Sequence, residues 1–177
     1  MKTAKVPAEK LIALLDLKPL PNEGGYFKET YRSQDILPAN CLSNRYGEDK
    51  NASTCILYLI TEQSFSALHK LKSDEIYHFY LGDPVELVAM HPDGQLKISV
   101  LGTDLANGAA PQAVIEAGCW QGSRLAQGGQ YALMGCTVAP GFDFSDYEDG
   151  DRNGLIDLFP QHREIIIRYT RENRDDY

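Results

Sequence analysis

Short segments rich in β-branched and aromatic residues recur along this chain, and clusters of Gly, Pro, Asn or Asp separate them. Short strands at intervals of roughly 8 to 12 residues with turns between them are typical of all-β sandwiches and barrels. We therefore predict an all-β fold whose core lies at about residues 23–140, with a long polar loop at 34–52. The expected strands span residues 26–33, 53–60, 64–69, 75–81, 85–90, 96–101, 112–115 and 131–138.

Helical patterns are confined to the two ends of the chain. Four aliphatic residues between 11 and 15 lie at near-helical spacing, and Pro7 suits a first helical turn, so we predict a short helix at about 8–16. A helical tail is expected at about 150–170, with one helix at 153–159 and a second beginning at Pro160. Ile165, Ile166 and Ile167 are also good strand material, so a strand remains the alternative for the last segment.

Length and charge limit the possible partners. A chain of 177 residues is expected to form a single domain, here 1–177. The net charge of −8 argues against nucleic acid and against an anionic membrane surface, and no run approaches the ~20 apolar residues of a membrane helix. The basic N-terminus lacks a convincing signal-peptide core. Four cysteines without CxxC spacing indicate free thiols, so we predict a cytoplasmic protein.

The stretch from His69 to Gly82 contains the best candidate for a functional site. It is predicted to form a strand, a tight acidic corner and a second strand, in which Glu75, Tyr77 and Phe79 share one face by strand alternation. A carboxylate on a face with two aromatic rings needs a partner, because burying an unpaired charge costs several kcal/mol. His69 on the preceding strand is the obvious partner. Two titratable groups facing an apolar interior predict a binding or catalytic pocket.

Two other polar clusters have less specific patterns. Lys28 and Arg32 share one face of the strand at 26–33, where Arg32 is a candidate contact for an anionic ligand, although an ordinary solvated edge strand is the alternative. The acidic run at 146–151 resembles a calcium-binding loop in composition. Its ligand spacing is wrong and no closing glutamate follows, so we interpret it as a solvated acidic turn.

Several blocks of sequence resemble a known family. His69, Glu75 and Gly82 match the first histidine, the glutamate and the closing glycine of the first cupin motif, and residues 116–121 are similar to the second motif. The closest resemblance is to the fifth cupin family, Cupin_5, a domain of unknown function, and it covers about residues 8–170. The blocks that carry it are Glu23-Gly24-Gly25-Tyr26, Thr30-Tyr31-Arg32-Ser33, Asp74–Tyr80, Gly118-Cys119-Trp120-Gln121 and Gly135–Phe142.

This resemblance implies a double-stranded β-helix, the RmlC-like jelly-roll barrel, with an internal pocket for a small molecule and usually with pairing into a homodimer. Metal-binding cupins present three histidines and a glutamate. Here Leu71 and Gln121 stand at two of the histidine positions, and a carboxamide is a poor ligand for transition metals. We therefore predict no cofactor; a divalent metal held weakly by His69, Glu75 and Gln121 is the alternative.

The cupin superfamily includes sugar epimerases and isomerases, and the fold alone does not choose a function. One hypothesis is a metal-independent isomerase or epimerase of a sugar-like or carbonyl substrate, with His69 as base and Glu75 orienting it. In that hypothesis, Tyr77 or Tyr58 returns a proton and Gln121 holds the enolate oxygen. Arg32 is expected to hold a phosphate, and Phe79 to contact the ligand. The alternative is a non-catalytic small-molecule-binding cupin, and a metal-dependent enzyme is disfavoured by Leu71 and Gln121.

Overall fold

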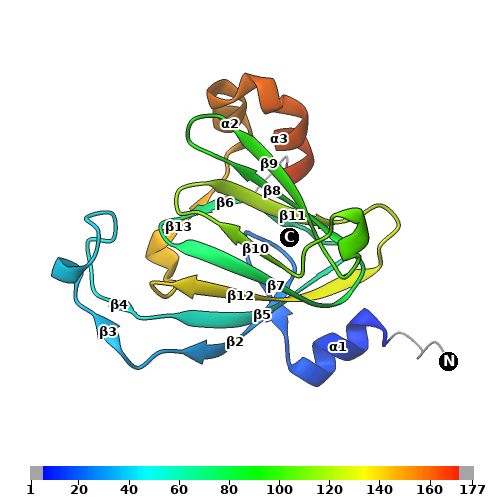
Figure 1. The fold of residues 1–177 in the computed structure, drawn as a ribbon, viewed down its shortest axis with the longest axis horizontal. Coiled ribbons are helices and arrows are strands. Elements are labelled where there is room, and N and C mark those ends of the chain that lie inside the picture. Colours follow the sequence, from blue (N-terminus) through cyan, green and yellow to red (C-terminus); the bar gives the residue numbers. More distant parts are fainter. Residues whose placement is uncertain (1–5, 172–177) are drawn as a thin grey trace.

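The computed structural model describes residues 6–171, and its centre is formed by two antiparallel sheets that face each other (Figure 1). The six-stranded sheet has the order β1 (Lys18–Pro19), β2 (Tyr26–Arg32), β5 (Thr54–Thr61), β12 (Tyr131–Ala139), β7 (Asp74–Gly82), β10 (Gln112–Ile115). The five-stranded sheet has the order β13 (Tyr147–Asp149), β6 (Ser66–Leu71), β11 (Trp120–Leu125), β8 (Val85–Met90), β9 (Leu96–Leu101).

The chain alternates between the two sheets as it advances from β5 to β8 and again from β10 to β13. This alternation is the double-stranded β-helix, or jelly roll, that was expected. The corner at Lys72–Ser73, just before Asp74, carries the chain from β6 in one sheet to β7 in the other. His69 and Glu75 therefore come from facing sheets, although only five residues separate them in the sequence.

Strand alternation along β7 decides which of its side chains point into the barrel and which point outward. Glu75 and Tyr77 are buried, and alternation places His78 on the outer side, where it contacts Thr137 Oγ1 at 3.1 Å and Gln112 Nε2 at 3.1 Å. The register with β12 shifts only later, so that Tyr80 is the extra residue of a bulge. The strand ends at Gly82 with φ +111°, where a Cβ would collide with the backbone of β12. The predicted inner face of this strand is confirmed.

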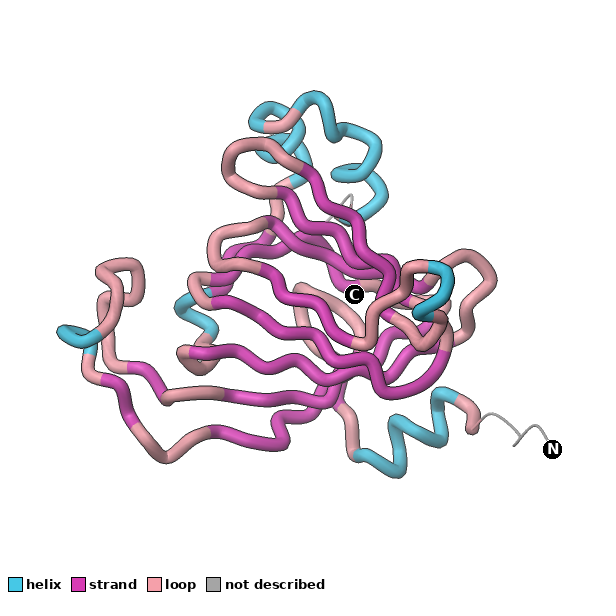
Figure 2. Tube along the Cα trace, viewed as in Figure 1, coloured by secondary structure: helices cyan, strands magenta, loops and turns pink. Residues whose placement is uncertain are grey.

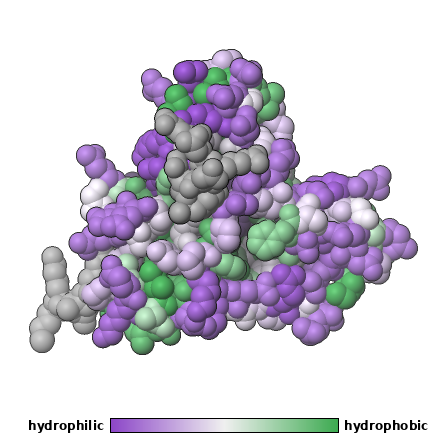
Figure 3. Space-filling model, turned by 180° about the vertical axis from the view of Figure 1, so that it is seen from behind, coloured by the Kyte–Doolittle hydropathy of each residue, from purple (hydrophilic) through white to green (hydrophobic). Residues whose placement is uncertain are grey.

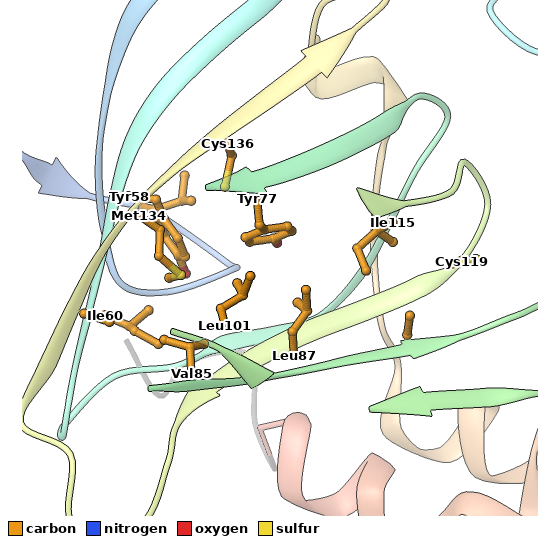
Figure 4. Packing of buried hydrophobic residues seen from close by; sticks show 13 residues of the cluster. Tyr58, Ile60, Tyr77, Val85, Leu87, Leu101, Ile115, Cys119, Met134 and Cys136 are labelled. Atoms are coloured by element: carbon orange, nitrogen blue, oxygen red, sulfur yellow. The ribbon is translucent and has the colours of Figure 1, made fainter. Parts of the chain in front are cut away.

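Three groups of buried side chains form successive layers. The largest lies between the sheets and joins Tyr77, Met134 and Cys136 to Leu87 and Leu101 from the opposite sheet (Figure 4). A second group packs helix α1 (Ala8–Leu15) against the outside of the six-stranded sheet. A third packs helices α2 (Arg152–Leu158) and α3 (Arg163–Tyr169) against the five-stranded sheet. Figure 2 shows the helices at the periphery of the strands.

Most predicted segments agree with these elements. Strands 85–90, 96–101 and 112–115 have the expected bounds, and the helices at both ends are present. The predicted helix, and not the alternative strand, forms in the last segment, where α3 spans Arg163–Tyr169 and the fully buried Ile166 packs with the third group. Short 3₁₀ turns connect other segments: η1 (Ala39–Cys41), η2 (Leu105–Asn107), η3 (Phe144–Asp146) and η4 (Pro160–His162).

Two loop predictions were wrong. The polar stretch 34–52 contains β3 (Ile36–Leu37) and β4 (Lys50–Asn51), which pair with each other in an arm that projects from the body (Figure 1). The acidic run at 146–151 contains β13, which pairs with β6 through Tyr147, Glu148 and Asp149. In both cases a neighbouring strand supplies hydrogen bonds that local composition does not reveal.

The face seen in Figure 3 is mostly hydrophilic, with hydrophobic side chains in small separate groups. Among residues 6–171, no helix combines the length and the apolar character needed to cross a bilayer.

Candidate functional site

A cavity of about 140 Å³ lies at one end of the space between the sheets. His69 from β6 and Glu75 from β7 reach it from opposite sides, and Glu23 reaches it from the turn before β2. The remaining lining is largely apolar. It comprises Leu20, Pro21, Phe27, Glu29, Arg32, Thr54, Ile56, Leu71, Cys136, Val138, Phe142, Asp143, Phe144 and Tyr147.

His69 is held in one orientation. Its side chain is almost fully buried, and its ring stacks on Tyr147 with a centroid distance of 5.3 Å and an interplanar angle of 17°. Nδ1 lies 2.8 Å from the carbonyl oxygen of Ala67, which can only accept, so Nδ1 carries the proton and donates it. In the neutral ring, Nε2 therefore carries the lone pair. Nε2 lies 4.0 Å from Glu23 Oε2, another lining group of the same cavity.

Glu75 is a buried carboxyl with few compensating contacts. Gln121 Nε2 donates to its Oε2 at 2.7 Å. Burial raises the pKa of Glu75 to about 7, and the nearby Glu23 charge adds to the rise, whereas His69 and the contacts from Cys136 and Gln121 oppose it. The group is thus close to half protonated at neutral pH. Such a carboxyl can either give or accept a proton there.

Glu23 lines the cavity, although it was not among the site residues expected from the sequence. Ser66 Oγ donates to Glu23 Oε1 at 2.8 Å, and this bond fixes the carboxylate at the cavity wall. The following Gly24 and Gly25 both have positive φ, and the space beside each is too small for a Cβ. The sequence signal was the Glu23-Gly24-Gly25-Tyr26 block itself, in which a tight turn places the preceding side chain inward.

The other predicted site residues lie around the cavity with different partners. The Tyr58 hydroxyl donates to the Gly24 carbonyl at 2.8 Å, and Tyr77 is buried in the inter-sheet core; burial raises the pKa of both phenols. Phe79 packs against that core farther along β7, and neither it nor the two tyrosines line the cavity. The proposed proton donors Tyr58 and Tyr77 are therefore behind the cavity wall.

Arg32 lines the cavity, but its guanidinium already has partners. It donates to both carboxylate oxygens of Glu29 at 3.1 and 2.7 Å, to Asn51 Oδ1 at 3.0 Å and to the Phe142 carbonyl at 3.1 Å. These bonds connect β2 to the chain that follows β12. A phosphate would have to replace some of them.

Within residues 6–171, no hydrogen bond joins His69 to Glu75, so the expectation that Glu75 orients His69 is wrong; Ala67 has that role. Gln121 also differs from its expected role, because its amide nitrogen bonds to Glu75 rather than facing a substrate oxygen. Its Oε1 is buried and has no hydrogen-bond partner. Gln121 therefore positions the carboxyl of Glu75.

The donor set does not fit a transition metal. Leu71 lines the cavity at a position where an imidazole would be needed, and Gln121 uses its amide to hold Glu75. Among the described residues, no group of three His, Cys, Asp or Glu side chains is placed to hold a metal ion. The cavity offers one imidazole among its described lining residues, whereas tight transition-metal sites use three or four imidazole, thiolate or carboxylate ligands.

One segment, residues 141–147, closes the outer side of the cavity. It contributes Phe142, Phe144 and Tyr147 to the lining, and Phe142 meets Phe144 edge-to-face with centroids 5.1 Å apart. Asp146 anchors the segment through ion pairs with the buried Lys50 at 2.7 Å and with Lys72 at 3.1 Å. Tyr147, which stacks on His69, follows this anchor directly and also pairs with Leu71 of β6.

Comparison with known proteins identifies the family. Residues 9–149 match the profile of the Cupin_5 family, described as Cupin superfamily (DUF985). This chain belongs to the Cupin_5 family. A curated relative is the uncharacterized protein YML079W of Saccharomyces cerevisiae, 37% identical over 134 residues, which are 71% of this chain and 66% of the yeast protein. The chain thus spans just under two thirds of that relative's length.

Two solved structures are similar to nearly the whole chain. Protein SO0799 from Shewanella oneidensis has a TM-score of 0.85 and 30% identity, covering 96% of this chain and 100% of its own. A hypothetical protein from Leishmania major has a TM-score of 0.87 and 32% identity, covering 94% and 100%. More distant cupins, including oxalate decarboxylase with 14% identity and a TM-score of 0.52, share the fold alone.

Proposed function

We propose that this cupin transfers protons at a carbon beside a carbonyl group, as a metal-independent isomerase or epimerase of a small sugar-like or carbonyl substrate. The observation that supports this most is the pair of titratable groups on facing walls of one cavity. His69 presents an Nε2 lone pair, and Glu75 has a pKa raised to about 7. General acid–base catalysis works best when the pKa of the catalytic group is near the working pH.

The two groups have complementary roles in this proposal. His69 Nε2 removes the proton from the carbon beside the carbonyl, which leaves an enolate and an imidazolium. Protonated Glu75 returns a proton from the facing sheet, either to the same carbon from the other side or to the neighbouring position. This assignment replaces the tyrosines as proton donors, because both lie behind the cavity wall. Glu23, 4.0 Å from Nε2, stabilises the imidazolium that forms.

Cavity size limits the reacting part of the substrate. A cavity of about 150 Å³ accepts benzene in another protein, and this one is about 140 Å³. The reacting portion is thus about the size of a single small ring or a short-chain keto or hydroxy compound. Larger parts of a substrate would extend past the Phe142–Phe144 edge.

The experiment is a solvent-exchange assay. The protein is incubated in heavy water with small aldoses, ketoses, sugar phosphates, nucleotide sugars and keto acids, and NMR follows loss of the C–H signal beside the carbonyl. We expect exchange on at least one compound, lowered ~100- to 10,000-fold in Glu75→Gln and in His69→Ala. Glu62→Gln, which removes an exposed carboxylate on a turn outside the cavity, is the matched control and should retain full activity.

The same samples test the competing functions. Exchange is measured with and without EDTA, and elemental analysis of protein dialysed without EDTA is expected to find less than one transition metal per chain. A stoichiometric metal together with EDTA-sensitive exchange would contradict the metal-independent mechanism. Absence of exchange on every compound, combined with binding of one of them, would favour the non-catalytic binding cupin.

A further inference from the structure

A second hollow lies outside the barrel, on the other side of the turn that carries Glu23. Its volume is about 870 Å³, and it shares Leu20 and Pro21 with the central cavity. The end of β11, the chain after β5 and the last turn of α3 form its other sides. The lining residues are Pro19, Leu20, Pro21, Gly24, Gly25, Tyr26, Gln63, Ser64, Phe65, Arg124, Ile167, Arg168, Thr170 and Arg171. We call it the arginine groove.

Arg124 is the unusual residue of this groove. Its guanidinium carbon lies 3.7 Å from the centroid of the Phe65 ring, so the planar group covers the ring face. Its Nε is buried and has no hydrogen-bond partner, and none of the contacts between described residues gives the guanidinium an acceptor or a carboxylate. A guanidinium stacked through its face keeps its edge N–H groups available as a bidentate fork.

The carboxylate of Glu86, the residue paired with Arg124 in the sheet, already has other partners. Glu86 lies opposite Arg124 in the β8–β11 pairing. Its Oε1 instead accepts from Tyr169 Oη at 2.6 Å and pairs with Arg168 Nη1 at 2.8 Å. Arg124 is therefore left as a half-buried positive charge beside a second guanidinium, in a chain whose net charge is −8.

Local electrostatics agree with this geometry. Burial lowers the pKa of the Arg124 guanidinium, and the positive charges of Arg168 and Arg171 act in the same direction, against the opposing contribution of Tyr169. The Phe65 and Tyr169 rings offset part of the cost of this half-buried charge, and an anion in the groove would offset more of it.

We propose that the arginine groove is a binding site for a small organic oxyanion, a carboxylate or a phosphate monoester, whose oxygens accept from the edge of Arg124. The apolar part of the ligand lies along Pro19–Pro21 and Tyr26, which also line the groove. The groove is far larger than the anionic group alone requires, which fits a ligand with an organic body. This inference does not depend on the catalytic role proposed for the central cavity.

The test uses three probes of matched size: phenyl phosphate, benzoate and neutral benzyl alcohol. Calorimetry measures their affinity for the full chain, and NMR follows the aromatic signals of Phe65 and His69. We expect one or both anions to bind and benzyl alcohol not to bind. The Phe65 signals should shift and those of His69 should not. Raising the salt concentration should weaken binding, because the contact is between charges near the surface.

Variants at Arg124 make the test specific. Arg124→Gln is expected to weaken anion binding about 10- to 100-fold, the usual effect of losing a charge-assisted contact. Arg124→Lys keeps the charge but loses the planar fork and should give an intermediate loss. Arg163→Gln removes the same charge from an exposed position on α3 outside the groove and should bind as the wild type does. Thermal melting checks that each variant is folded.

Three results would overturn the proposal. The first is failure of the wild type to bind either anion. The second is unchanged affinity in both Arg124 variants. The third is a shift of the His69 signals without a shift of Phe65, which would place the anion in the central cavity. If Arg124→Gln does not fold, the anion affinity of Arg124→Lys and the NMR shifts of Phe65 and His69 still test whether the anion binds at Arg124.

Discussion

Glu75 gives the cavity its chemical character, and the same residue is expected to lower the stability of the protein. Its pKa is about 7 in the folded chain, against an ordinary value of 4.5. Between these values the folded state holds a proton that the unfolded chain has lost. Stability therefore falls as pH rises from about 4.5 to about 7, and the loss is complete above pH 7.

Replacing Glu75 with Gln removes that titration. The variant is expected to gain stability relative to the wild type as pH rises, reaching about 3 kcal/mol at pH 8. Urea denaturation of both proteins at pH 4, 6 and 8 measures the difference. A stability difference that stays constant across this range would show that Glu75 ionises at its ordinary pKa.

The sequence indicated some of these side chains and not others. His69 and Glu75 could be predicted because motif spacing and strand alternation place them on the inner face. Glu23 could not, because its position depends on how the turn through Gly24 and Gly25 folds over the end of the barrel. The role of Tyr58 was missed for a similar reason. Alternation gives the face of a side chain, but not its depth or its hydrogen-bond partner.

Among the elements, the segment 141–147 connects the fold to the site most directly. Asp146 and Lys50 are both buried, and each has a second ionic partner, Lys72 for Asp146 and Glu48 for Lys50. Breaking a buried ion pair leaves an uncompensated charge. Here the second partners reduce that cost.

We therefore expect Lys50→Met and Asp146→Asn each to destabilise the protein by about 2–3 kcal/mol. This loss is at or below the smallest loss of stability that is usual when one partner of a buried ion pair is removed. Chemical denaturation measures the loss. Lys18→Met, which removes the exposed pair with Asp16, is the control and should have no measurable effect. Equal effects in the buried and exposed variants would mean that Lys50 and Asp146 do not anchor this segment.

The strands that could be predicted are those whose own residues have a composition typical of strands. Strands 85–90, 96–101 and 112–115 are rich in aliphatic residues and lie between turn or loop residues. The short β4 and β13 have polar or acidic sequences, and β3 is only two residues long within a polar stretch; each of them pairs with another strand. Their existence depends on tertiary pairing, which a local pattern does not contain.

For the whole molecule, we propose a homodimer. Strand β1 pairs only with Tyr26 and Phe27, so within residues 6–171 the outer edge of β2 from Lys28 to Arg32 has no partner strand. Tyr31 on this edge is 54% exposed. Open edges of this kind are commonly covered by a second chain.

Light scattering at micromolar concentration is expected to give twice the mass of the 177-residue chain. Tyr31→Lys should give a folded monomer, because a charge on an edge strand opposes pairing. A monomeric wild type would contradict the proposal.

The most direct test of the acid–base account is the titration of Glu75 itself. The side-chain carboxyl carbons of glutamate are labelled with ¹³C, the Glu75 signal is assigned from Glu75→Gln, and its chemical shift is followed from pH 3 to pH 9. We expect a midpoint near 7, because burial raises the pKa of this carboxyl. A midpoint near the ordinary value of 4.5 would mean that Glu75 is fully ionised at neutral pH and cannot return a proton to a substrate.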